Sequence, residues 1–115
     1  MLKVYGLKNC DTCRKALKWL EAEAIGHTFL DVRKDGVTQA DVEGWADAVG
    51  VDVLLNRRGT TWRKLSDAEK AKAEKEADAI SLMTSQPSLI KRPVFVDGTN
   101  VLVGFTDDVR DKLKV

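Results

Sequence analysis

The chain has 115 residues, of which 43% are hydrophobic and 32% are charged, and its net charge at neutral pH is +1. This length suits one domain with a hydrophobic core that needs no disulfide for stability. The near-neutral charge excludes a bulk attraction to nucleic acid, and no apolar run is long enough to span a membrane. The first residues, MLKVYG, lack the features of a secretory signal, so we expect a cytoplasmic protein that binds neither nucleic acid nor membranes.

The N-terminal third predicts a β-α-β unit. An apolar stretch at residues 2–7 (LKVYGL) indicates a strand that ends in a turn at Gly6–Asn9. From Cys13 the apolar residues recur at helical spacing, and Gly26 is the expected end of that helix. His27–Val32 (HTFLDV) alternates, which predicts a second strand, parallel to the first because a helix separates them.

The middle of the chain is predicted to be mostly helical. Thr38 is the expected start of a helix that runs through Val49 and ends at Gly50. The segment 56–65 (NRRGTTWRKL) contains a glycine, two threonines and four basic residues, which predicts a basic loop.

A second helical stretch follows this loop. Ser66, with Glu69 three residues later, forms a capping-box pattern that predicts an alanine- and lysine-rich helix to about Ala79. The apolar residues after Ala79 predict another short helix, which ends before Pro87.

The C-terminal part predicts a hairpin and a final helix. Residues 92–105 (RPVFVDGTNVLVGF) contain two strand patterns joined at Asp97–Gly98, a strong hairpin signal. Thr106 is the expected N-cap of a helix that reaches Leu113.

This order, β-α-β, a helical middle and then β-β-α, is the order of an α/β, thioredoxin-like fold with an all-helical insertion between its halves. We expect a single domain over residues 1–115, with the thioredoxin-like core at about 1–35 and 88–115. The insertion is expected at about 36–87. A Cys-x-x-Cys pair beside a β-α-β pattern is typical of a redox site.

Both cysteines, Cys10 and Cys13, lie in the stretch KNCDTCRKA at the strand-to-helix junction. The thiolate is the attacking species, and the positive end of a helix dipole with nearby Lys8 and Arg14 favours it, while Asp11 opposes it. Cys10 comes first at the helix mouth and is the expected nucleophile, with Cys13 as the resolving thiol. Two buried structural thiols are the alternative.

A zinc site is a further alternative reading of the two cysteines. It normally needs four ligands, and the other soft candidate in the chain is His27. His27 is expected to be an ordinary strand residue, and we predict no metal site.

Basic residues form two clusters away from the cysteines. Arg92 precedes Pro93, which holds it extended and fixes the direction of its side chain. A guanidinium beside the cysteine pair would suit a carboxylate of a tripeptide thiol or a tetrahedral oxyanion. Arg57 belongs to the other cluster. The remaining members of that cluster could equally form a solvated surface: Arg58, Arg63 and Lys64.

Three motifs, in order and spacing, resemble the arsenate reductase and Spx family (ArsC-like proteins) over essentially the whole chain. They are VYGLKNCDTCRKALKWLE at the start, LLNRRGTTWRKL in the middle and SLIKRPVFVDG near the end. The middle motif is most similar to the YffB-like branch, whose members are regarded as glutathione-dependent thiol reductases. In thioredoxin-like folds the proline at the place of Pro93 is typically cis and lies against the active-site cysteines, so the resemblance implies the same here.

The resemblance also bears on arsenate. Family arsenate reductases bring three arginines around one cysteine, and Cys10 matches the cysteine while Arg92 matches one arginine. The second arginine falls on Asn56, with Arg57 adjacent, and the third is expected after the last strand, where residues 101–105 (VLVGF) contain no basic residue. Fewer charge-assisted contacts weaken oxyanion capture, which disfavours arsenate as the substrate.

The prediction is therefore an enzyme, a glutathione-dependent thiol-disulfide reductase with Cys10 and Cys13 as catalytic residues. Glutathione is the expected reductant or co-substrate, no cofactor is expected to be tightly bound, and we expect a monomer that acts on a disulfide substrate, with glutaredoxin as a further partner. Two alternatives stay open: an arsenate reductase coupled to glutathione and glutaredoxin, and an Spx-type redox-sensitive regulator that binds the RNA polymerase α subunit. The residues expected to bind glutathione or substrate are Arg92, Arg57, Asp11, Thr12, Arg14 and Pro93.

Overall fold

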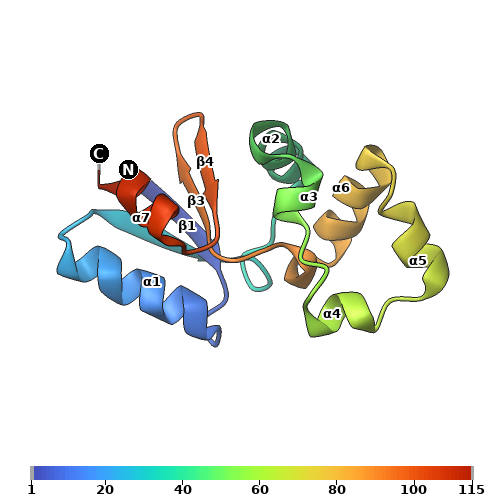
Figure 1. Cartoon of the computed structure of the whole chain (residues 1–115), viewed down its shortest axis with the longest axis horizontal. Coiled ribbons are helices and arrows are strands. Elements are labelled where there is room, and N and C mark those ends of the chain that lie inside the picture. The colour runs from blue at the N-terminus through green and yellow to red at the C-terminus, as the bar shows by residue number, and fades with distance from the viewer. Residues whose placement is uncertain (1, 115) are drawn as a thin grey trace. The chain divides into compact units, whose positions relative to one another are not determined.

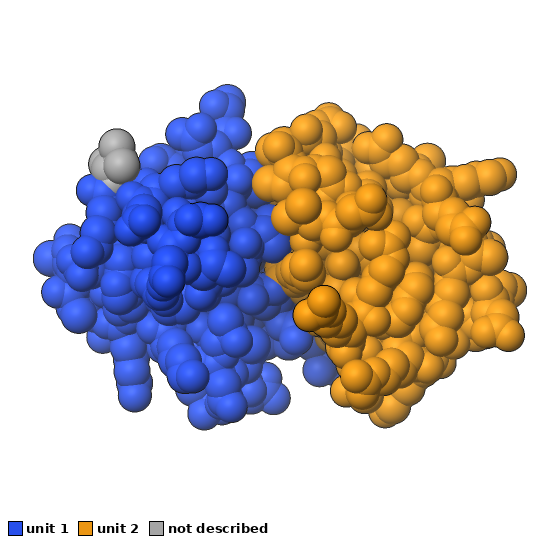
Figure 2. Space-filling view, viewed as in Figure 1, with its two compact units in different colours: residues 1–35, 92–115 blue, residues 36–91 orange. Residues whose placement is uncertain are grey.

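The computed structural model describes residues 2–114 and divides the chain into two compact units. Unit 1 contains residues up to Asp35 and from Arg92 onward, and unit 2 contains Gly36–Lys91 (Figures 1 and 2). No helix in residues 2–114 is long and apolar enough to cross a membrane. The elements of unit 1 are β1 (Leu2–Gly6), α1 (Asp11–Ala22), β2 (His27–Asp31), β3 (Val94–Asp97), β4 (Asn100–Val103) and α7 (Asp107–Leu113).

Within the described residues, the strands of unit 1 form one four-stranded sheet in the order β2-β1-β3-β4. β1 pairs in parallel with β2, with Gly6 opposite Asp31, and antiparallel with β3. β3 and β4 form the predicted antiparallel hairpin, in which Gly98 adopts a φ of 61° that favours glycine. The predicted thioredoxin-like element order is confirmed.

The core of unit 1 joins this sheet to α1 and α7. β1 buries alternate residues, including Leu2 and Val4, on one face. Ala16 and Leu20 of α1 and residues of β3 and α7 pack in the same cluster, so both helices are tied to the sheet by apolar contacts. The apolar side chains that pack around this cluster while remaining partly exposed are Leu17, Trp19, Ile25, Phe29, Leu102, Phe105 and Leu113.

Unit 2 is built from helices, as the sequence predicts for the middle of the chain. Thr38 caps α2, since its side chain accepts from the N–H of Asp41, and Gly50 follows its last residue with a φ of 88°. An isolated antiparallel bridge pairs Leu55 with Ile90 and so joins the two ends of the segment 55–90. The elements are α2 (Gln39–Val49), α3 (Val51–Leu54), α4 (Thr60–Arg63), α5 (Asp67–Lys72), α6 (Glu76–Ser85) and a 3-10 helix, η1 (Pro87–Leu89).

Two expectations for unit 2 were wrong in part. Residues 60–63 form the short helix α4 within the segment expected to be a loop. The helix that begins after Ser66 ends at Lys72, not near Ala79, and α6 starts separately at Glu76. The high helical propensity of this alanine- and lysine-rich stretch predicts one continuous helix. The chain instead turns at Ala73, which is buried, because the burial of a side chain outweighs the helical propensity of its exposed neighbours.

The end of α1 also differs from the prediction. The helix ends at Ala22, and Ala24 adopts a left-handed backbone with a φ of 56°. The N–H groups of Glu23 and Ala24 still bond to carbonyls of the last turn, and the N–H of Ile25 bonds to the Leu20 carbonyl. The stop therefore precedes Gly26, and an alanine takes a conformation that usually favours glycine.

Candidate functional site

The candidate site forms where β1 ends and α1 begins. The N–H of Cys10 donates to the Leu7 carbonyl at 3.2 Å, and the Cys10 carbonyl accepts from the N–H of Arg14 at 2.9 Å. Cys10 is therefore the N-cap residue of α1, with an extended backbone. This position places its thiol beside the unpaired N–H groups and the positive dipole end of a three-turn helix.

The two thiols differ in exposure. Both are free; Cys10 is half-buried, whereas the side chain of Cys13, in the first turn of α1, is fully buried. An incoming sulfur can therefore reach Cys10 from solvent, while the buried Cys13 lies beside Cys10. The predicted order of nucleophile and resolving thiol agrees with this difference in access.

Their acidities differ in the same direction. Partial burial alone would raise the pKa of Cys10, but hydrogen bonding from the N–H and thiol of Cys13 and from the Arg92 guanidinium, with the charge of Arg92, holds that pKa below its ordinary value. Burial raises the pKa of Cys13 to about 11, and the negative charge of Cys10 adds to this rise, while the N–H of Leu7 opposes it. The site thus favours the thiolate at Cys10 and the protonated thiol at Cys13.

Arg92 approaches the cysteines from the other half of unit 1. The Arg92–Pro93 peptide bond is cis, as the resemblance implied, and Pro93 is buried. Arg92 directs its guanidinium to Cys10. The structure therefore brings Cys10, Cys13 and Arg92 together although they lie far apart in the sequence.

Three further predicted residues occupy the first turns of α1. Asp11 and Arg14 form an exposed ion pair at 3.6 Å. The Nε of Arg14 donates to the Lys8 carbonyl at 3.1 Å, which fastens the loop before Cys10 to the helix. Thr12 is exposed at the second helical position. Arg14 thus has a structural contact, and its binding role remains a prediction.

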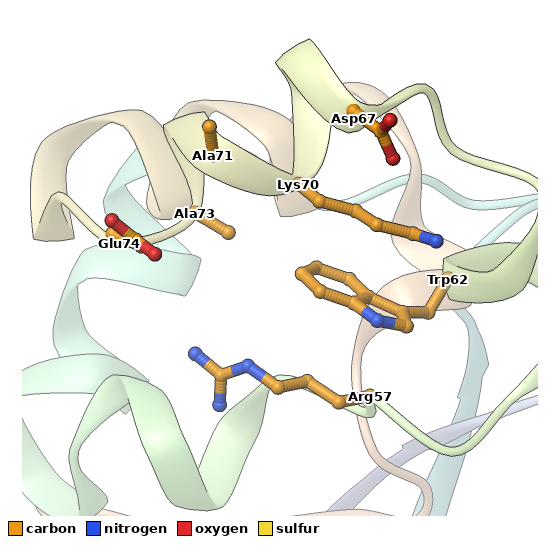
Figure 3. Close-up of a pocket in the computed structure, with 7 residues that line it drawn as sticks. All are labelled: Arg57, Trp62, Asp67, Lys70, Ala71, Ala73 and Glu74. Atoms are coloured by element: carbon orange, nitrogen blue, oxygen red, sulfur yellow. The ribbon is translucent and has the colours of Figure 1, made fainter.

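Arg57 lies in unit 2. Its guanidinium donates to Asp52 at 3.1 Å and lies over the Trp62 ring at 5.7 Å. Arg57 and Trp62 line a pocket of about 340 Å³. Lys70 extends along the other side of the Trp62 indole in this pocket (Figure 3). Asp67 and Glu74 add carboxylates to this pocket, so it carries both signs of charge. The predicted contact of Arg57 with glutathione remains a prediction.

Sequence reasoning missed Gly6. A Cβ at this position would lie 2.6 Å from the Cys13 Sγ, so the missing side chain makes room for the sulfur. The signal available in the sequence was a glycine at the end of the strand that leads into the cysteine pair. Among residues 2–114, no group of three or more His, Cys, Asp or Glu side chains is placed to hold a metal ion.

Comparison with known proteins assigns the chain to a family. Residues 5–113 match the model described as the ArsC family. The chain is 43% identical to an uncharacterised protein of Haemophilus influenzae over 93% of each chain, and 25% identical to the global transcriptional regulator Spx of Staphylococcus aureus over 94% of this chain and 82% of Spx.

Solved structures agree with this result. A YffB protein is 41% identical, and the two structures superpose over the whole of both chains with a TM-score of 0.93. An arsenate reductase-related protein of Brucella melitensis is 39% identical over 96% of this chain and 92% of that chain, with a TM-score of 0.77. The cysteine motif, the cis proline and the sheet order thus occur in a chain that belongs to the ArsC family.

Proposed function

We propose that this protein is a glutathione-dependent thiol-disulfide reductase. The observation that carries the proposal is the pair of opposite pKa shifts: the accessible Cys10 has a lowered pKa, and the pKa of the buried Cys13 is raised to about 11. A lowered pKa increases the fraction of Cys10 present as the attacking thiolate, and a raised pKa keeps the second thiol protonated until the first has reacted.

The first step is attack of the Cys10 thiolate on one sulfur of a substrate disulfide. A bond forms between Cys10 and that sulfur, the substrate S–S bond breaks, and the leaving thiolate takes a proton from solvent. The product is a mixed disulfide on Cys10. Arg92, which donates to the Cys10 sulfur, stabilises the thiolate before attack and lowers the nucleophile's pKa rather than the substrate's.

Formation of the mixed disulfide changes Cys13. The negative charge of Cys10 and its hydrogen bond with Cys13 both raise the pKa of Cys13, and both disappear when the Cys10 sulfur becomes part of a disulfide. The Cys13 thiol then loses its proton more easily and attacks the Cys10 sulfur. A Cys10–Cys13 disulfide forms, and the second substrate thiol leaves.

Two molecules of glutathione complete the cycle. The first attacks the Cys10–Cys13 disulfide and forms a mixed disulfide with Cys10, and the second displaces Cys10 and leaves as oxidised glutathione. Glutathione can also resolve the first mixed disulfide directly, because burial of Cys13 slows the internal route. On this proposal, Arg92 holds a glutathione carboxylate, and Asp11, Thr12, Arg14 and Pro93 line the binding site within unit 1.

Trapping with oxidised glutathione tests the proposal. Intact masses are compared for the wild type, Cys10→Ser and Cys13→Ser after incubation. We expect a glutathione adduct on Cys13→Ser, because Cys10 can attack but no resolving thiol remains, and no adduct on Cys10→Ser. Adduct formation that does not depend on Cys10 would contradict the assignment.

A regulatory role is the second candidate, favoured by the 25% identity with Spx over most of both chains. On this alternative the cysteine pair senses oxidation, and the protein binds the RNA polymerase α subunit. Capture of purified α subunit by the reduced protein but not the oxidised protein would support it. Turnover of arsenate in the presence of glutathione and glutaredoxin is the parallel assay for the third activity that the family resemblance implies.

A further inference from the structure

We propose that Gly6 is a positioning residue for the resolving thiol, because its missing side chain leaves the space at the end of β1 that the Cys13 sulfur occupies. The inference rests on the proposed function of the cysteine pair. On this inference, position 6 is a glycine because the Cys13 sulfur needs the space, and not because the backbone conformation requires one.

The contact distances identify the sulfur as the atom that excludes a side chain. A Cβ on Gly6 would meet the Cys13 Sγ at 2.6 Å, far inside a normal contact. The other neighbours of that Cβ, the Cys13 Cβ at 3.5 Å and the Phe29 Cε1 at 3.4 Å, are at or near contact distance. An alanine at position 6 would therefore conflict with one atom.

The backbone gives no reason for a glycine. The glycines with positive φ are Gly36, Gly50, Gly98 and Gly104, and Gly6 is not among them. Gly6 instead is the last residue of β1, opposite Asp31 in β2, and its carbonyl accepts from the N–H of Val32 at 2.9 Å. Any L-residue could adopt this extended strand conformation.

Position 6 also limits where the Cys13 sulfur can go. Cys13 is fully buried in the first turn of α1, and one of the three staggered side-chain rotamers is rare in helices. A methyl group at position 6 would move the sulfur away from the N–H of Leu7 and from Cys10, both of which it now faces. Gly6 thus keeps the two sulfurs in reach of each other.

The test is a double-mutant cycle on the full-length protein: Gly6→Ala, Cys13→Ala and the pair combined. The readout is the rate of Cys10 alkylation by iodoacetamide as a function of pH, under reducing conditions. We expect Gly6→Ala to slow alkylation at pH 7 by about two- to fivefold, because the displaced Cys13 thiol no longer donates to the Cys10 thiolate. In the Cys13→Ala background, Gly6→Ala should leave the rate unchanged, since the conflicting sulfur is gone.

A second readout follows the disulfide itself. Equilibration with reduced and oxidised glutathione converts the two thiols to the Cys10–Cys13 disulfide while oxidised glutathione becomes two reduced molecules. We expect Gly6→Ala to require a several-fold higher ratio of oxidised to reduced glutathione for half-conversion. Gly44→Ala is the matched control, because a Cβ on Gly44 would meet no atom within 4 Å.

Two outcomes would overturn the inference: an equal loss of alkylation rate in both backgrounds, or a combined variant that fails to fold. If Gly6→Ala alone fails to fold while the combined variant folds, the sulfur is the conflicting atom and the inference stands. Failure of Cys13→Ser to form a glutathione adduct would instead contradict the proposed function. The alkylation cycle does not depend on glutathione and separates the two failures.

Discussion

Cys10 and Cys13 lie three residues apart in one sequence motif, yet the structure gives them opposite chemical properties. The difference comes from depth: Cys10 at the helix mouth is half-buried and faces donors, whereas Cys13 is fully buried. Desolvation acts against the charged form of both thiols, and hydrogen bonding and the Arg92 charge reverse it for Cys10 alone. The sequence predicted the pair and a favoured thiolate at the helix mouth, but not the raised pKa of Cys13.

At the residue scale, replacement of Arg92 tests the source of the Cys10 acidity. Arg92→Gln removes the positive charge and should raise the pKa of Cys10, so that less thiolate is present at pH 7. We expect alkylation of Cys10 at pH 7 to slow by about five- to tenfold, as for loss of a charge-assisted hydrogen bond worth about 1–1.5 kcal/mol. The pH profile of the alkylation rate measures the shift directly.

Arg33→Gln provides the matched control for this substitution. Arg33 is an exposed arginine in the same unit and is not among the groups that shift the pKa of Cys10. The pH profile of Cys10 alkylation in Arg33→Gln should match that of the wild type. If the two variants slow alkylation equally, the effect is one of overall charge, and Arg92 has no specific role.

At the element scale, the sequence predicted the starts of three helices through their capping residues and missed the ends of α1 and α5. Thr38, Ser66 and Thr106 each accept a hydrogen bond from a first-turn N–H, as their capping patterns predicted. Such caps are local and can be identified from a few neighbouring residues. The end of α5 at Lys72 depends on which residues find a buried position, and the local sequence does not contain that information.

The end of α1 offers a stability test at the same scale. Ala24 has a φ of 56°, a left-handed conformation that costs an L-residue about 1–2 kcal/mol and costs glycine little. Ala24→Gly should therefore stabilise the protein by about 0.5–1 kcal/mol after the greater chain entropy of unfolded glycine is subtracted. Chemical denaturation measures the free energy of unfolding.

The same substitution within a helix should have the opposite sign. Ala48 is exposed in α2, and Ala48→Gly should destabilise the protein by about 1 kcal/mol. Destabilisation by both substitutions would show that the backbone at position 24 is not left-handed in solution.

At the scale of the whole molecule, the chain leaves unit 1 after Asp35 and returns at Arg92, so the site's residues come from both ends of the sequence. Periodicity and turn signals predicted the strands that carry them, but no local pattern could show that Arg92 reaches Cys10. The family resemblance supplied that link through the KRP motif. Gly6 escaped prediction because its role depends on a distance to the Cys13 sulfur, which only the folded chain defines.

Burial of Cys13 should make the stability of the whole protein sensitive to alkaline pH. The folded-state pKa is raised from an ordinary value of 9.0 to about 11, so the thiol favours the folded state fully below pH 9. As pH rises from 9 through 11, the unfolded chain releases this proton first, and the contribution is lost. The two-unit shift corresponds to about 2–3 kcal/mol.

Denaturation of the reduced protein at pH 8, 9, 10 and 11 checks this prediction against Cys13→Ala. Cys10 is present in both proteins, and its lowered folded-state pKa acts in the opposite direction, so it does not add to the loss. The wild type should lose stability relative to Cys13→Ala as pH rises, because the variant has no buried thiol to ionise. Parallel curves would mean that folding does not raise the pKa of Cys13, and the proposed order of attack and resolution would lose its physical basis.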